Sequence, residues 1–171
     1  SPRLVRGAAD FALRRNQSDI SCVHERAGPP LTATFFAIEG ERIACYAAHL
    51  ARAVSQLANR YPGDGVLDDR VAILVSDDAF AAALRPALVA ALAAVFSATR
   101  RFSLIDADEA AATLFSDALA DERLVVSSID RFDGLERPFV FVAGVDAAGV
   151  DMSVIRSMIY RGITRAQIMV N

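Results

Sequence analysis

The sequence predicts an α/β domain in which a mainly parallel sheet lies between layers of helices. Short apolar runs alternate along the chain with longer segments whose apolar residues recur at helical spacing. The run Val71–Val75 is apolar at every position, as expected of a strand buried on both faces of a parallel sheet. The chain has 171 residues, 54% of them hydrophobic, which suffices for one domain with a substantial core.

The strands are short apolar runs that end at turn or breaker residues. Gly40 ends the first run, and a turn-forming segment at residues 61–65 lies before the second. The predicted strands are residues 32–38, 71–75, 102–105, 123–127, 139–143 and 167–170.

Helical segments fill most of the chain between these strands. Residues 17–31 are predicted to be a loop, because they lack an apolar period and end in Gly28-Pro29-Pro30. Pro86 is predicted to begin a separate helical piece, since proline is tolerated at the first position of a helix. The predicted helices are residues 2–16, residues 41–60, a segment after strand 71–75, a piece from Pro86 to about residue 96, a segment ending near residue 119, and residues 152–162.

Carboxylates stand where three of these helices begin. A carboxylate at this position accepts hydrogen bonds from backbone N–H groups that have no partner within the helix. The predicted caps are Asp77 or Asp78, Asp106 or Asp108, and Asp151. The chain begins inside a helix and ends on a strand, so we expect residues 1–171 to be one domain of a larger protein.

Composition excludes two kinds of chemistry for this polypeptide alone. Its 18 basic residues are all Arg, and a P-loop or a Schiff-base enzyme requires Lys. The net charge is −3, but it is unevenly distributed. Residues 1–60 carry +3, residues 61–122 carry −7 and residues 123–171 carry +1, so a polyanion is expected to avoid the middle third.

No metal site, membrane anchor or leader sequence is predicted. The two Cys and two His residues lack the paired spacing of metal ligands, and we interpret them as residues of a protein in a reducing compartment: Cys22, His24, Cys45 and His49. The apolar stretch 87–98 is shorter than a membrane-spanning helix. We therefore expect a cytoplasmic protein that binds no membrane.

The first candidate site is the loop at residues 127–136, which joins two predicted strands. Ligands of parallel sheets gather at the carboxyl ends of strands, so the backbone N–H groups of this loop can meet a phosphate and Glu136 a ribose. An ordinary solvated turn around Asp133-Gly134 is the alternative. Elsewhere, Phe35 and Phe36 can stack on bases, although adjacent aromatic residues in a strand usually place at least one in a core.

The second candidate site is the segment at residues 160–166, between a helix and the last strand. Arg165 stands near the helix end, where a cation offsets the helix dipole. A guanidinium at this place can instead reach across a domain interface to the terminal phosphate of a nucleotide. A surface Arg at a helix terminus is the alternative.

Together, the two segments resemble motifs V and VI of the second RecA-like domain of superfamily 1 helicases. The UvrD/Rep type has Thr-x-His-x-x-Lys-Gly-Leu-Glu and, later, Tyr-Val-x-x-Thr-Arg-Ala. Residues 128–136 correspond to the first and residues 160–166, which begin about 25 residues later, to the second. Asp130 replaces the His and Asp133 replaces the Lys. The motif V segment is also similar to Val-Asp-x-Phe-Gln-Gly-x-Glu of the other large branch of the superfamily.

The resemblance implies a three-layer RecA-like fold, related to P-loop NTPases, and assigns roles to individual residues. Arg165 would be the arginine finger that contacts the γ-phosphate. The nucleotide would be bound by Gly134, Leu135 and Glu136, with Glu136 on the ribose. Single-stranded nucleic acid would be contacted by Ser128, Asp130, Arg131 and Arg161. Ser76 stands where the UvrD type has a nucleotide-binding Arg.

The resemblance also implies partners. ATP and Mg²⁺ would be bound mainly by an N-terminal RecA-like domain of the same protein, so the isolated domain would be inactive. Single-stranded DNA is the expected nucleic acid, in preference to RNA. A degenerate helicase-like binding module without ATP hydrolysis is the alternative, which Ser76 and Asp133 favour. An unrelated α/β nucleotide or signalling domain is a third hypothesis.

Overall fold

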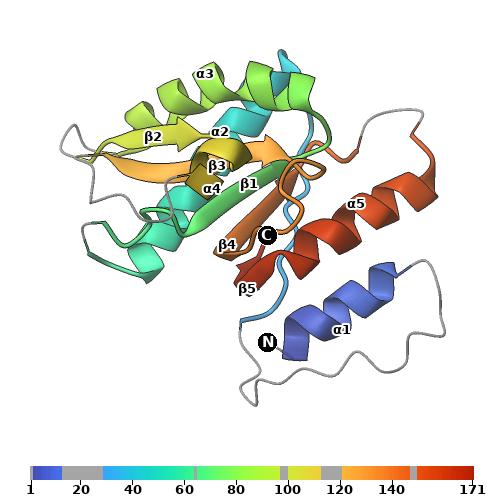
Figure 1. Cartoon of the computed structure of the whole chain (residues 1–171). Coiled ribbons are helices and arrows are strands. Elements are labelled where there is room, and N and C mark those ends of the chain that lie inside the picture. Colours follow the sequence, from blue (N-terminus) through green and yellow to red (C-terminus); the bar gives the residue numbers. More distant parts are fainter. Residues whose placement is uncertain (1, 13–28, 64, 97–99, 113–120, 147–149) are drawn as a thin grey trace.

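A computed structural model describes residues 2–12, 29–63, 65–96, 100–112, 121–146 and 150–171 (Figure 1). Within these ranges, five strands form one parallel sheet in the order β2-β3-β1-β4-β5. The strands are β1 (Val71–Val75), β2 (Phe102–Ile105), β3 (Glu122–Ser128), β4 (Arg137–Ala143) and β5 (Ala166–Val170). The helices are α1 (Pro2–Phe11), α2 (Arg42–Arg60), α3 (Asp78–Val95), α4 (Ala107–Ala112) and α5 (Met152–Thr164).

The helices form two layers, one on each face of the sheet. Alternate residues of the central strand β1 point to opposite faces, so Ile73 joins the core beneath α2 and α3, while Leu74 joins the core beneath α1, α4 and α5. Figure 1 shows α1 lying alongside α5. This three-layer arrangement confirms the predicted α/β fold with a mainly parallel sheet and is consistent with a RecA-like domain.

Side chains cap the helices largely as predicted. Asp77 rather than Asp78 caps α3, since its carboxylate accepts a 2.8 Å hydrogen bond from Phe80 N. Asp106 rather than Asp108 caps α4: its carboxylate accepts a hydrogen bond from Glu109 N, and the Glu109 carboxylate accepts one from Asp106 N. Asp151 caps α5 as expected.

The predicted strand at residues 32–38 is wrong. This segment makes one backbone hydrogen bond to β5, from Thr32 N to Val170 O, and continues without a ladder. Most of its side chains are exposed, so neither face of a strand would bury an apolar row. The pattern of Thr and Phe favours a strand locally, but none of the described strands pairs with the segment along its length.

The predicted helix break at Pro86 is also wrong, because α3 continues through it. The helix buries Leu84 before the proline, and Leu88 and Leu92 after it, on the same face of the sheet. Packing on both sides therefore offsets the loss of one backbone hydrogen bond. Residues 13–16 and 113–119, at the ends of two predicted helices, lie outside the described residues.

Helix α3 is also long and apolar enough to span a membrane by length and composition. It buries one face against the sheet, as the core helix of an α/β domain does, and exposes an alanine-rich face that includes Val89 and Val95. A membrane-spanning helix and the core helix of an α/β domain share this sequence pattern, so α3 is weak evidence for a membrane.

Buried ion pairs fix the amino-terminal edge of the sheet. Asp68 and Asp69 lie in the turn before β1, and they pair with Arg123 of β3 at 3.0 Å and Arg137 of β4 at 2.8 Å. Burial opposes ionisation of Asp68, but hydrogen bonds from Arg123 outweigh it and hold the pKa of this carboxyl below its usual value. These contacts tie the turn to both neighbours of the central strand.

Candidate functional site

The turn that joins β3 to β4 carries the first candidate motif. Both strands run parallel to β1, so the chain must return from the carboxyl edge of the sheet to its amino edge before β4 begins. Ile129 and Phe132 are fully buried beneath this turn, and Gly134 adopts a φ of +88° near its end. The buried anchors leave the side chains of Asp130 and Asp133 exposed on a fixed backbone.

This path corrects one expectation about the site. The turn was predicted to lie at the carboxyl ends of the strands, but only its beginning does. Glu136 lies beside the first residue of β4, at the opposite edge, where Gln167 of β5 approaches its carboxylate at 3.4 Å. The reversal follows from strand direction, which periodicity alone does not give.

The end of α5 carries the second candidate motif. Gly162 lets the helix approach β4 closely, since a Cβ at this position would lie 2.5 Å from Val142 Cγ2. Arg165 follows as the residue that ends the helix, and its backbone oxygen accepts a 3.0 Å hydrogen bond from Arg137 N. The side chains of Arg161 and Arg165 are thereby brought to the turn between β3 and β4.

Four residues of the two motifs form one ion-pair cluster, called here the Asp133 cluster: Asp130, Asp133, Arg161 and Arg165. Arg161 donates to Asp130 and, at 2.7 Å, to Asp133 Oδ2. Arg165 Nη2 lies 3.8 Å from Asp133 Oδ1. The hydrogen bond to Asp130, together with that to Asp133, raises the pKa of Arg161 against the opposing effect of burial.

Arg165 is the less satisfied of the two guanidinium groups. Its Nε is buried and has no hydrogen-bond partner among the described residues. Its contact with Asp133 is longer than a hydrogen bond. Arg85 Nε and Ser127 Oγ are likewise buried without a partner among the described residues, and an ordered water or a ligand can supply such a partner.

Comparison with known families identifies the segment that holds both motifs. Residues 123–171 match the UvrD-like helicase C-terminal domain family. The matched segment runs from β3 to β5 and includes the whole Asp133 cluster. This finding confirms the resemblance to a C-terminal UvrD/Rep-like helicase domain and supports a helicase domain. No curated protein matches the chain.

The residues predicted to contact nucleic acid fall into two groups: one is buried, and three reach the surface. Asp130 and Arg161 contact one another in the Asp133 cluster. Ser128 is 2% exposed, and its hydroxyl donates a 2.6 Å hydrogen bond to Asp78 at the start of α3. Arg131 pairs with the exposed carboxylate of Asp108 in α4. Ser128 therefore anchors the turn, whereas the other three side chains reach the surface.

The residues predicted to bind the nucleotide lie at the other end of this turn. Gly134 has open space around the position of a Cβ, so a ligand can approach its backbone. Leu135 is half-buried and packs on the core beneath α5, while Glu136 is exposed. The backbone hydrogen bond between Arg137 and Arg165 sets the two motifs side by side at the start of β4 and β5.

Ligands for a metal ion do not gather in the part of the chain described. There, no three His, Cys, Asp or Glu side chains are arranged to hold one. Cys22 and His24 lie outside the described residues. The Cys45 thiol donates to the backbone oxygen of Glu39, and the His49 ring stacks on Phe36 at 3.9 Å.

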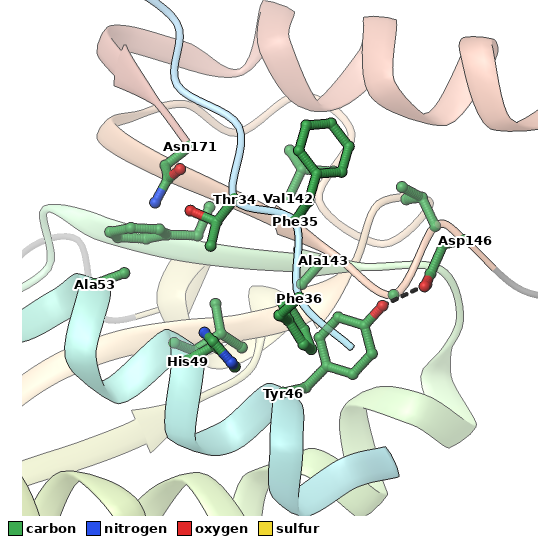
Figure 2. A pocket seen from close by; sticks show the side chains of 14 residues that line it. Thr34, Phe35, Phe36, Tyr46, His49, Ala53, Val142, Ala143, Asp146 and Asn171 are labelled. Carbon is green, nitrogen blue, oxygen red and sulfur yellow. Dashed lines mark hydrogen bonds between the residues drawn. The ribbon is translucent and has the colours of Figure 1, made fainter. Parts of the chain in front are cut away.

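A hollow lies at the carboxyl end of β4 and was missed by sequence reasoning (Figure 2). Its volume is about 280 Å³, and its walls come from residues 34–36, α2, the end of β4 and Asn171. In Figure 2, the Tyr46 hydroxyl of α2 donates to Asp146, which follows β4. Burial and this hydrogen bond raise the pKa of Tyr46 to about 12.

The aromatic pair at residues 35–36 was the only sequence signal for this hollow. Phe36 packs between Tyr46 and His49, while Phe35 is 94% exposed. One of the two rings therefore serves the core, as the local pattern suggests. The remaining walls come from segments far apart in the chain, so no single motif marks them.

Proposed function

We propose that this domain is the second RecA-like domain of an ATP-dependent superfamily 1 DNA helicase or translocase. One observation carries the proposal: Arg161 and Arg165, from the end of α5, meet a single anion in the turn that leads to Gly134 and Glu136. The match of residues 123–171 to the UvrD-like helicase C-terminal domain family supports it.

Arg165 is the residue proposed to act on the reacting phosphate. A guanidinium is always charged and presents several N–H donors in one plane, so it can stabilise charge that develops on the γ-phosphoryl oxygens. Its Nη2 lies 3.8 Å from Asp133, farther than a hydrogen bond, so this end of the side chain can gain a phosphate oxygen as acceptor. Arginine fingers of this kind contribute roughly 10³–10⁵ in rate.

The other nucleotide contacts come from the end of the turn. The exposed carboxylate of Glu136 can accept hydrogen bonds from ribose hydroxyls, and the open backbone at Gly134 allows the sugar to approach. Leu135 fixes this stretch by packing on the core. ATP supplies the phosphoryl group and Mg²⁺ the neutralising cation.

Most of the binding energy for that nucleotide would come from another domain. This chain has no Lys, so a P-loop must be supplied by a first RecA-like domain, which we place in the same protein. Residues 1–171 would then form one wall of an inter-domain cleft. Closing and opening this cleft would move the two domains along a strand.

Single-stranded DNA is the proposed track. Arg131 and Arg161 reach the surface, and the carboxylates that pair with them, Asp108 and Asp130, are exposed. A DNA phosphate can replace an exposed carboxylate at small cost. Ser128 would act indirectly, by holding the turn through Asp78.

The test is ATP hydrolysis by the longest natural polypeptide that contains this chain, with and without single-stranded DNA. We expect DNA to stimulate hydrolysis in the wild type, and Arg165→Ala to lower the stimulated rate by about 10³–10⁵. Arg52→Ala is the matched control, because Arg52 is an exposed Arg of α2 on the opposite face of the sheet. Turnover that is indifferent to Arg165 would show that the motif VI assignment is wrong.

A second candidate function is a helicase-like binding module without hydrolysis. Two observations favour it: a carboxylate faces the proposed finger, and Ser76 hydrogen-bonds to Asp77 where the UvrD type has an Arg. A wild-type protein that is folded and binds single-stranded DNA but hydrolyses no ATP would establish this alternative in the same assay.

A further inference from the structure

We infer that Asp133 competes weakly with the terminal phosphate of the nucleotide for Arg165. This inference rests on the proposed function. Asp133 stands where the two resembled motifs have Lys or Gln, so the charge at this position differs from theirs.

The contacts of Asp133 resemble those of a bridging phosphate. Its two oxygens face two different guanidinium groups, with Oδ2 at 2.7 Å from Arg161 and Oδ1 at 3.8 Å from Arg165. A terminal phosphate at Arg165 would make the second of these contacts with more charge. One oxygen of Asp133 therefore faces the guanidinium that we assign to the terminal phosphate.

The cluster is built so that only one of its two Arg residues depends on Asp133. Arg161 keeps a second anionic partner when Asp133 moves away, either Asp130 or the DNA phosphate proposed to replace it. The Arg165 side chain contacts Asp133 alone among the carboxylates of the described residues. Displacement of Asp133 would thus release Arg165 and leave Arg161 in place at the end of α5.

The contact is weak enough for a ligand to replace. The Asp133 side chain is 54% exposed, and its distance to Arg165 exceeds that of a hydrogen bond. Water and salt screen such a pair, so its contribution is small. A terminal phosphate that bears about two negative charges would outcompete a single carboxylate at the same guanidinium.

This competition would favour a triphosphate over a diphosphate. A nucleoside diphosphate has no γ-phosphoryl group to reach Arg165, so Asp133 would return to Arg165 after hydrolysis. The carboxylate would then weaken the binding of ATP slightly and help to open the cleft once phosphate has left.

The test compares Asp133→Asn with wild type in the full-length protein, with ATP varied at saturating single-stranded DNA. Asparagine keeps the shape of the side chain and removes its charge, so we expect KM for ATP to fall by about two- to fivefold while kcat does not rise. Asp133→Glu restores the charge and is expected to return KM toward the wild-type value. Asp10→Asn removes one charge from an exposed position on α1 and is expected to leave both constants unchanged.

Each outcome either supports or overturns the competition between Asp133 and the terminal phosphate. A folded Asp133→Asn protein whose KM is unchanged or raised would overturn the inference, because Asp133 would then position Arg165 rather than compete for it. If Asp133→Asn does not fold, Asp133→Ser serves as the uncharged variant. If Arg165→Ala leaves turnover intact, the proposed function itself fails, whereas a normal response to Arg165→Ala with no effect at Asp133 removes only the competition.

Discussion

The same chemical pair, an Arg and an Asp, occurs in two settings around the start of β4 and β5. Arg137 meets Asp69 at 2.8 Å, and its side chain is 6% exposed. Arg165, whose backbone is hydrogen-bonded to that of Arg137, meets Asp133 at 3.8 Å, and its side chain is 25% exposed. The first pair is largely shielded from solvent, whereas the second is open enough for a ligand to reach it.

The difference shows how one edge of a sheet separates folding from function. The buried pairs of Arg123 and Arg137 hold the turn before β1 and thereby the order of the central strands. The Asp133 cluster holds no strand in place, and its carboxylates are largely exposed. If this division is correct, substitutions in the buried pairs should lower the free energy of unfolding, and substitution of Arg165 in the Asp133 cluster should lower ATP turnover.

The largest effect is expected at Arg165, on turnover and not on stability. Arg165→Ala removes the proposed finger, so ATP hydrolysis by the full-length protein should fall by roughly 10³–10⁵, equivalent to about 4–7 kcal/mol at the transition state. Its free energy of unfolding should change by about 1 kcal/mol or less, because the contact with Asp133 is long and partly exposed. Urea unfolding and steady-state kinetics of the same preparation check both. A loss in the free energy of unfolding as large as the loss in transition-state stabilisation would remove the contrast with Arg137.

The next effect is expected at Arg137, on stability. Arg137→Ala leaves the Asp69 carboxylate mostly buried without its partner, so the free energy of unfolding should fall by about 3 kcal/mol. Arg161→Ala is the comparison, with an expected loss of about 1 kcal/mol or less because its partners are exposed. Urea titration measures both variants. Similar losses would mean that burial does not separate the two settings.

A third effect tests whether the close approach of α5 to β4 positions Arg165. Gly162→Ala places a Cβ 2.5 Å from Val142 Cγ2, closer than van der Waals contact allows, so α5 must move away from β4. Overpacking of this kind costs about 1–3 kcal/mol, and it should also lower turnover because Arg165 moves with the helix end. Val142→Ala in the same protein makes room and is expected to restore part of both losses. Failure of this second change to restore either would show that the close approach is not what positions Arg165.

The sequence predicted the frame of this site better than its contacts. The strands that flank the turn and the cap at Asp151 follow from local patterns, and the structure contains them. Residues 32–38 have the local pattern of a strand without a partner to form one, so tertiary structure decided against it. Arg161 and Asp133 are 28 residues apart, and no local rule pairs them. Their contact depends on how closely α5 docks on β4, which packing determines.

The smallest effect is expected from acid, and it concerns the buried setting. The pKa of Asp68 is lowered in the folded protein, since burial opposes ionisation but hydrogen bonds from Arg123 outweigh it. A carboxyl whose folded pKa is lowered stabilises the fold above its unfolded value of 3.8, and this contribution is lost as the pH falls through the folded pKa. The free energy of unfolding of the wild type should therefore decline on acidification below about pH 4 more steeply than that of Asp68→Asn.

Urea titrations at a few pH values between about 5 and 3 measure this difference in slope. Asp10→Asn controls for the loss of one negative charge, because it removes an exposed carboxylate from α1 without touching the amino edge of the sheet. The slope should flatten more in Asp68→Asn than in this control. Identical slopes would mean that the Arg123–Asp68 pair persists in the unfolded chain or contributes nothing net. The buried setting would then rest on Arg137 and Asp69 alone.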